Sequence, residues 1–368
     1  MSDAAKSVTG APREGGDRRP VSDEQRKQFW MDRFRRARTD MDKKGETAAT
    51  PPPQPPAGPG GKRYLHARVT STLCGSGPTA YWAFEPAAPS PASAPVIVLL
   101  HGWGGTEPML YGMWIDHLVM RGNVVLFPVY QESIKAGRDT VLGNCLGAIR
   151  DAMAASGSAG PTRRDWERYA ISGHSAGGVL AAQIAAASGR ERLPRPKAVM
   201  AVHPSRGHGV TRPLPRANLL TIAPETLALI VIGKDDEAAG DADARAMFGQ
   251  TPQIPRANKD FVTVVSDFHG TQPLVANHVA PLAPRVAYAM RSSEISTRSM
   301  IDFARLKGSR VDALNYYGYW KLLDALCDAA FYGANREYAL GNTPQQRFMG
   351  KWSDDAPVNE LVICPPQP

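Results

Sequence analysis

Residues 166–188 read WERYAISGHSAGGVLAAQIAAAS, and this stretch decides how the chain folds. Residues 166–172 have the pattern of a short strand, and residues 179–188 form an apolar run of strong helix formers. Between them, Gly173 and Gly177 flank Ser175. We therefore expect a sharp, strained turn from strand to helix, in which side chains at the flanking positions would collide with the neighbouring strand or helix.

Strand and helix patterns alternate on both sides of this turn. We expect strands at residues 64–72, 80–84, 95–101, 123–127, 166–172, 197–202, 227–232 and 261–266, and helices at 111–121, 138–156, 179–188 and 242–249. The first two strands form an antiparallel pair, and the continuous apolar run at 95–101 is typical of a strand buried on both faces. This alternation predicts the α/β class, with a mainly parallel central sheet and helices on both faces.

The composition divides the 368 residues into three parts. Residues 1–63 are expected to be a disordered, basic extension that includes a Pro/Gly-rich linker at 50–61. Residues 64–290 form the folded core. Residues 291–368 form a helical extension, rich in aromatic residues at 316–320, that either packs on the core or covers the site as a lid.

The formal charge of +8 is concentrated near the N-terminus. Residues 1–63 carry 14 Lys and Arg against 9 Asp and Glu, so the rest of the chain is close to neutral. This distribution argues against nucleic-acid binding as the main function. Within the extension, a capping box at 22–25 precedes the basic and aromatic residues 29–34. The segment is either an amphipathic helix in weak contact with a membrane surface or a partner, or a solvated helix.

Other classes of protein are excluded by what the sequence lacks. It contains no run of about 18 apolar residues that would predict a membrane span. Its first 30 residues hold no apolar secretory segment, so we expect a cytoplasmic protein, with export as the alternative. The four cysteines are widely separated and form no Cys-x-x-Cys pair, which predicts neither a zinc site nor a redox motif. We expect no cofactor and no metal.

The turn at Ser175 predicts a nucleophile. A serine nucleophile needs a base to take its proton and an acid to orient that base, and in this type of fold the order along the chain is serine, acid, histidine. Asp235 and Asp236 follow the strand at 227–232, at the sheet edge where ligands bind. Because adjacent residues point in opposite directions, at most one of them faces the site. The alternative is that both are solvated loop residues.

Elimination leaves two candidate histidines for the base. Of the eight histidines, only His269 and His278 lie beyond the expected acid. His269 lies in the segment 267–270, which comes directly after the last expected strand, and a glycine follows it, so we expect it to be the base, with His278 as the alternative. Four of the other histidines are expected to have structural positions. His101 forms hydrogen bonds, His174 packs beneath the turn, and His203 and His208 lie beside the pocket and are not metal ligands.

Two backbone N–H groups are expected to stabilise an oxyanion. The N–H of Ala176 is expected near the N-terminus of the helix that follows the turn, where an oxyanion can be held. The second donor is the N–H of Trp103 in the loop His101-Gly-Trp-Gly-Gly105, which follows the strand at 95–101. The Trp103 ring then lines the site; the alternative is that the ring only packs.

With these residues in place, the chain resembles the alpha/beta-hydrolase superfamily over residues 64–290. The motifs at 101–105 and 173–178 are similar to the oxyanion and nucleophile motifs of lipases, cutinase-type polyester hydrolases and chlorophyllase-like esterases. The spacing Gly-x-x-Asp at 233–236, frequent in such hydrolases, favours Asp236 over Asp235 as the acid. The sequence His278-Val-Ala-Pro281 is similar to the surroundings of the catalytic histidine in cutinase-type enzymes, which keeps His278 as an alternative base.

The resemblance implies a serine hydrolase that cleaves carboxylic esters through an acyl-enzyme intermediate. Ser175 would be the nucleophile, His269 the base and Asp236 the acid, with a small-molecule or lipid-like ester as substrate. A peptidase or a thioesterase would use the same residues, because selectivity for the leaving group depends on the shape of the pocket. A non-catalytic binding protein of the same fold is the alternative from a different class.

Overall fold

The computed structural model describes residues 49–133, 135–155, 162–207, 213–270, 272–289 and 310–363. The contacts within the chain separate Met1–Ala48 from Ala49–Pro368, and every feature reported below belongs to the second unit. The basic segment expected at 22–34, the start of the C-terminal extension at 291–309, and His208 lie outside the described residues.

In the described part of the second unit, the centre is a sheet of nine strands in the order β1-β2-β4-β3-β5-β6-β7-β8-β9. The strands are β1 (Arg68–Cys74), β2 (Tyr81–Ala87), β3 (Ser93–Leu100), β4 (Val124–Pro128), β5 (Arg163–His174), β6 (Ala198–Val202), β7 (Leu227–Gly233), β8 (Lys259–Val264) and β9 (Val362–Ile363). The six strands from β4 to β8 in this order run parallel, whereas β1, β2 and β9 pair antiparallel with their neighbours. The α/β class and the mainly parallel sheet are therefore confirmed.

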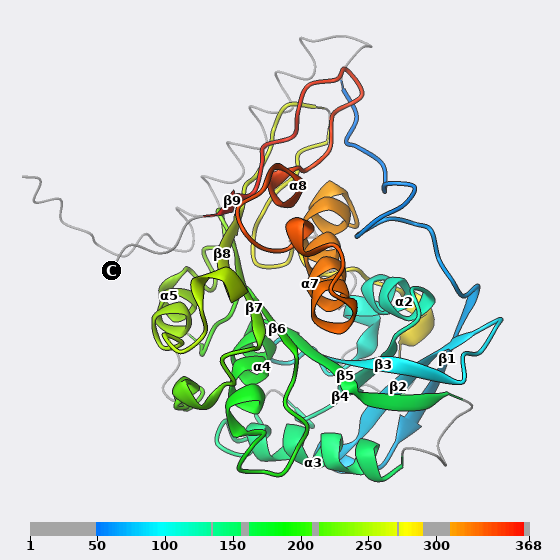
Figure 1. Ribbon diagram of the computed structural model, residues 1–368, viewed down its shortest axis with the longest axis vertical. Helices are drawn as coiled ribbons and strands as arrows, with labels where there is room; N and C mark the ends of the chain where they lie inside the picture. Colours follow the sequence, from blue (N-terminus) through cyan, green and yellow to red (C-terminus); the bar gives the residue numbers. More distant parts are fainter. Residues whose placement is uncertain are drawn as a thin grey trace, which may run out of the picture. The chain divides into compact units, whose positions relative to one another are not determined.

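Helices cover both faces of this sheet (Figure 1). The helices are α2 (Gly112–Met120), α3 (Val141–Ala154), α4 (Ala176–Ala187), α5 (Ala242–Gly249), α7 (Lys321–Tyr332), α8 (Pro344–Arg347) and the π-helix η7 (Leu314–Trp320). Short 3₁₀ helices are η2 (Gly77–Thr79), η3 (Pro108–Tyr111), η4 (Leu219–Thr221), η5 (Arg256–Asn258), η6 (Val286–Tyr288) and η8 (Arg336–Tyr338). One core cluster packs α2, η7 and α7 on one face, and a second packs α3, α4 and α5 on the other.

The central strands are apolar on both faces because both faces are covered. In β3, every residue from Ala94 to Leu100 is buried. The helix α4 is buried on nearly every side, and its alanines keep it narrow enough to lie close to β5 and β6. None of the helices in the described part of the chain is long and apolar enough to cross a membrane.

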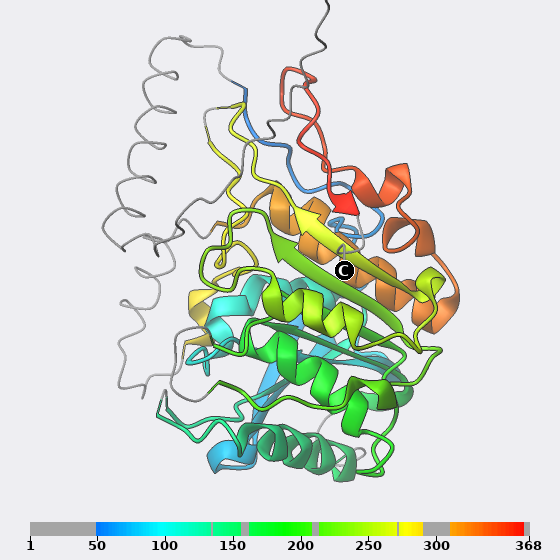
Figure 2. The same ribbon diagram turned by 90° about the vertical axis from the view of Figure 1, so that its left-hand side faces the viewer.

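Residues 49–63 are not the linker that their composition predicts. They form a strap that runs beside the C-terminal segment (Figure 2), where the hydroxyl of Tyr317 donates to the carbonyl of Pro53 at 3.2 Å. The N–H of Gly60 donates to Asp324 of α7 at 2.7 Å. The expected boundary at residue 64 is therefore wrong, and the described body begins at Ala49.

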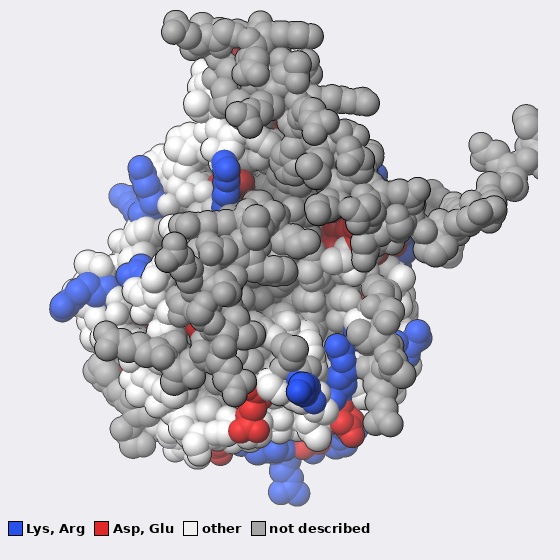
Figure 3. Space-filling view, turned by 180° about the vertical axis from the view of Figure 1, so that it is seen from behind, with Lys and Arg blue, Asp and Glu red and all other residues white. Residues whose placement is uncertain are grey.

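A buried group of charges attaches the strap to the helices. Asp324 accepts from His117 of α2 at 2.8 Å and lies 3.1 Å from the guanidinium of Arg121. Burial alone would raise the pKa of Asp324, but His117, Arg121 and the N–H of Gly60 outweigh burial and lower it. On the face drawn in Figure 3, the described Lys and Arg side chains are dispersed and do not form one basic patch.

The described part of the C-terminal segment belongs to the fold rather than to its surface. The helix α7 contacts β5, β6 and β7, and the strand β9 pairs with β8 and extends the sheet. Trp320 and Trp352 are buried in the same cluster as α2. Of the two expected roles, packing on the core is the one seen for residues 310–363.

Candidate active site

The turn between β5 and α4 has the strained geometry expected for a nucleophile. Ser175 has φ 57° and ψ −120°, a positive-φ conformation that non-glycine residues rarely adopt. A Cβ at Gly173 would lie 2.1 Å from the carbonyl oxygen of Gly177, and a Cβ at Gly177 would lie 2.3 Å from the carbonyl oxygen of Leu100. The prediction that side chains at the flanking positions would collide is therefore confirmed.

Three residues far apart in the sequence form a chain of hydrogen bonds at this turn. Nε2 of His278 lies 3.0 Å from Oγ of Ser175, and Nδ1 of His278 lies 2.8 Å from Oδ2 of Asp236. Ser175 follows β5, Asp236 follows β7, and His278 lies in the loop after β8, so all three stand at the carboxyl edge of the parallel sheet. The side chain of Asp236 is fully buried, and that of His278 is 23% exposed.

The expectation that His269 pairs with Ser175 is wrong, and the alternative His278 takes that position. Nε2 of His269 contacts Asp354 at 2.7 Å, and its ring packs near Trp352. The cause is a hairpin after β8, in which Asp267 and Leu274 exchange backbone hydrogen bonds. His269 lies in the outer part of this hairpin, whereas the returning chain brings His278 to the sheet edge.

The two adjacent aspartates point to different partners, as expected. Asp236 contacts His278, and its Oδ1 accepts from the N–H groups of Ala238 and Ala239 at 3.0 and 2.9 Å. Asp235 instead accepts from the hydroxyl of Ser266, which in turn accepts from the N–H of Ala276 at 2.8 Å. Asp235 therefore fixes the loop that carries His278.

The hydrogen bonds determine which ring nitrogen of His278 carries the proton. Because Asp236 is an acceptor when ionised, Nδ1 of His278 carries the hydrogen, and its Nε2 is free to accept from the hydroxyl of Ser175. Burial alone raises the pKa of Asp236, but the contacts with His203 and His278 outweigh burial and hold its pKa well below the ordinary value. Asp236 is therefore an anion at neutral pH.

The loop after β3 lies against the nucleophile. The position of a Cβ on Gly102 is 3.2 Å from Cβ of Ser175, which places the next residue, Trp103, at the expected side of the site. Ala176 is the first residue of α4, so its N–H has no acceptor within the helix. The guanidinium of Arg138 stacks on the Trp103 ring, 4.0 Å from its centroid. The loop and the helix start are thus both adjacent to Ser175.

A second chain of hydrogen bonds links this loop to the loop of His278. The N–H of Gly102 donates to the hydroxyl of Tyr111 at 2.9 Å, and that hydroxyl lies 2.9 Å from Nδ1 of His174. Nε2 of His174 donates to the carbonyl of His278 at 2.8 Å. Burial lowers the pKa of His174 well below its ordinary value, so its ring is neutral. His174 therefore does more than pack beneath the turn.

His101 has the structural role expected of it. Its ring stacks on Tyr130 and contacts the carbonyls of Gly102 and Val129 at 2.7 and 2.8 Å. Burial lowers its pKa to about 4. The ring therefore anchors the loop after β3 and takes no part in the hydrogen bonds of Ser175.

His203, which follows β6, has a role at the site that was not expected from the sequence. Its Nδ1 lies 2.9 Å from Oδ2 of Asp236, and its Nε2 lies 3.0 Å from the hydroxyl of Tyr319 in η7. The N–H at Nδ1 is not aligned well enough for a straight hydrogen bond, so the contact with Asp236 is bent and mainly electrostatic. The signal in the sequence was the position of His203, which directly follows β6, the strand that lies beside β7 and so near the acid.

The three histidines at the site do not offer the free lone pairs that a metal needs. His174, His203 and His278 have ring nitrogens within 4.8 Å of one another. The contacts described above already engage both nitrogens of each ring. A metal ion there would have to break the contacts that orient Asp236 and Ser175.

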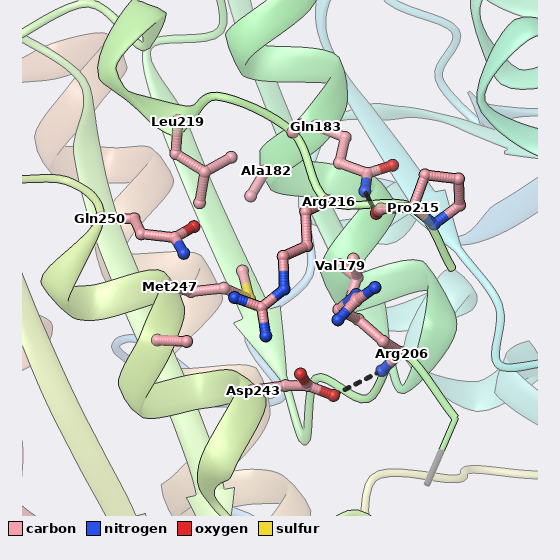
Figure 4. A pocket seen from close by; sticks show the side chains of 12 residues that line it. Val179, Ala182, Gln183, Arg206, Pro215, Arg216, Leu219, Asp243, Met247 and Gln250 are labelled. Carbon is pink, nitrogen blue, oxygen red and sulfur yellow. Dashed lines mark hydrogen bonds between the residues drawn. The ribbon is translucent and has the colours of Figure 1, made fainter. Parts of the chain in front are cut away.

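A pocket on the α4 and α5 side of the sheet is separate from these residues (Figure 4). Its lining includes Val179, Arg206, Arg216, Asp243 and Met247, and the N–H of Arg206 donates to Asp243 at 2.7 Å. Its cavity of about 30 Å³ suits water rather than a substrate. We therefore do not assign the substrate to it.

Comparisons with known proteins add no family to this geometry. Neither the models of known protein families nor the curated proteins contain a match to the chain.

Proposed function

We propose that this protein is a serine hydrolase of the alpha/beta-hydrolase type that cleaves carboxylic esters. The observation that carries the proposal is the contact of His278 Nε2 with Ser175 Oγ at 3.0 Å, with Asp236 on the opposite ring nitrogen. A serine, a histidine and a buried carboxylate in this order of contact are the components of nucleophilic acyl transfer. The strained φ of Ser175 is a second, independent support.

In the first half of the reaction, Oγ of Ser175 forms a bond to the carbonyl carbon of the ester while its proton passes to Nε2 of His278. Asp236 stabilises the imidazolium that results. The N–H groups of Trp103 and Ala176 stabilise the oxyanion. The tetrahedral intermediate then breaks its bond to the alcohol, which leaves with the proton from Nε2 and gives the acyl-enzyme.

In the second half, water replaces the alcohol. His278 takes a proton from the water, whose oxygen forms a bond to the acyl carbon. The acid leaves as the proton returns to Oγ of Ser175. None of these steps requires a group beyond the side chains and backbone N–H groups named above. Peptides and thioesters would be cleaved by the same steps, so the experiment below determines which of these leaving groups the protein accepts.

Turnover of p-nitrophenyl esters of increasing acyl length tests this function. The wild type should hydrolyse at least one of these esters, and Ser175→Ala should be reduced to background. Amide and thioester analogues of the best substrate distinguish an esterase from a peptidase or a thioesterase. Equal rates for the wild type and Ser175→Ala on every substrate would contradict the proposal and favour a non-catalytic binding protein.

A further inference from the structure

The C-terminal segment reaches the acid of the site through two buried side chains. Tyr319 of η7 is fully buried, and its hydroxyl lies 3.0 Å from Nε2 of His203. Nδ1 of the same ring lies 2.9 Å from Oδ2 of Asp236, the oxygen that also contacts His278. The order of contacts is therefore Tyr319, His203, Asp236, His278 and Ser175.

The geometry fixes the proton on His203. If Nδ1 carried no hydrogen, its lone pair would face the carboxylate at 2.9 Å, which is repulsive. The hydrogen therefore lies on Nδ1, and Nε2 accepts from the hydroxyl of Tyr319. Burial lowers the pKa of His203, which keeps the ring neutral beside the anion.

The backbone supports this arrangement at a cost in local strain. His203 has φ 47°, which is strained for a residue with a side chain. Tyr319 lies in a seven-residue π-helix; π-helices are rare in proteins, but those that occur are frequently found at functional sites. The N–H of His203 donates to the carbonyl of Val231 in β7 at 2.7 Å, which holds the residue beside the strand of the acid.

We propose that His203 and Tyr319 are positioning residues that hold Asp236 ionised and oriented toward His278, so that the C-terminal segment completes the catalytic machinery. This inference rests on the proposed function. Tyr319 selects the tautomer of His203, and His203 places a second N–H, after that of His278, beside Oδ2 of Asp236. Neither residue touches the substrate.

The proposal predicts a change in pH dependence that a purely structural role would not produce. The acid limb of the kcat/KM profile reports the proton uptake of the coupled Ser175–His278–Asp236 unit. Without the contact from His203, the unit takes up a proton more readily, and the limb moves to higher pH. The titratable groups that face Asp236 and its neighbours are His174, His203, His278 and Tyr319, with Asp312 facing Tyr319.

The experiment measures kcat/KM against pH on one ester for the wild type and four variants. We expect the limb to rise by about one pH unit in His203→Ala and by less in Tyr319→Phe. His203→Asn should restore most of the wild-type profile. The amide nitrogen of asparagine is bonded to Cγ, as Nδ1 of histidine is, so its N–H can take the place of the Nδ1–H beside Asp236, and asparagine tolerates a positive φ. Tyr317→Phe, which removes a hydroxyl of η7 that contacts Pro53 instead, is the matched control and should leave the profile unchanged.

If the wild type is active and the pH profiles of wild type, Tyr319→Phe and His203→Ala superimpose, this inference is overturned while the proposed function stands. A shift in Tyr317→Phe equal to that in Tyr319→Phe would also overturn it, because it would show a general effect of η7. A wild type without turnover on any substrate would overturn the proposed function and this inference with it. If His203→Ala does not fold, Tyr319→Phe, which keeps the ring and its packing, decides the outcome.

Discussion

Removal of the Tyr111 hydroxyl should weaken both the stability and the activity of the protein. In Tyr111→Phe, the buried N–H of Gly102 and Nδ1 of His174 each lose a partner at 2.9 Å. A buried polar group without a partner costs about 1–3 kcal/mol, so we expect a loss of about 2–4 kcal/mol in the free energy of unfolding. The assay is urea denaturation followed by tryptophan fluorescence, with kcat measured on the same samples.

The activity should fall because Gly102 directly precedes one of the proposed oxyanion donors. The loss of one such donor lowers kcat by about 10²–10³-fold. A donor that is displaced but not lost should have a smaller effect, and we expect kcat to fall by roughly 10-fold to 100-fold. Tyr169→Phe is the control, since its buried hydroxyl has no partner among the described residues. That variant should keep wild-type stability and activity. If Tyr111→Phe behaves like Tyr169→Phe, the reasoning about the hydrogen bonds through His174 is refuted.

Three other perturbations test separate parts of the structure. His278→Ala should lower kcat on the order of 10⁴-fold while His269→Ala keeps most of its turnover, and the reverse ranking would refute the pairing with Ser175. Asp324→Ala should lower the free energy of unfolding by about 3–5 kcal/mol in urea, because it removes the carboxylate between His117 and Arg121; a change below about 1 kcal/mol would be inconsistent with the buried ion pairs. The pKa of Asp236 is held below its ordinary value of 3.8. The free energy of unfolding that the wild type gains over Asp236→Asn from this shift should therefore be fully present above pH 3.8 and decrease as the pH falls below it. Parallel curves of unfolding free energy against pH for the two proteins would argue against the shift.

The parts of the structure that the sequence predicted are those set by local pattern. The parallel strands are continuous apolar runs, and the turn at Ser175 is specified by Gly173 and Gly177, which leave no room for a Cβ. That only one of Asp235 and Asp236 faces the site was predictable because adjacent residues at a strand end diverge, and the spacing Gly-x-x-Asp, frequent in the hydrolases that the chain resembles, favoured Asp236. Each of these inferences depends on a few neighbouring residues.

The parts that were not predicted depend on contacts between distant segments. His269 lies in the hairpin after β8, and its ring contacts Asp354 and Trp352, which are more than 80 residues away in the sequence. The proline-rich strap reads as a linker because its contacts with Asp324 and Tyr317 are invisible in its own composition. The contact of Tyr319 with His203 spans 116 residues and has no local signature.

The central claim is that Ser175 is a nucleophile activated by His278. Intact-mass analysis after incubation with a fluorophosphonate measures this directly, since the probe bonds to an activated serine hydroxyl. We predict a single adduct on the wild type and on His269→Ala, located at Ser175 by peptide mapping, and none on Ser175→Ala or His278→Ala. An adduct of equal yield on Ser175→Ala, or no adduct on the wild type, would contradict the claim.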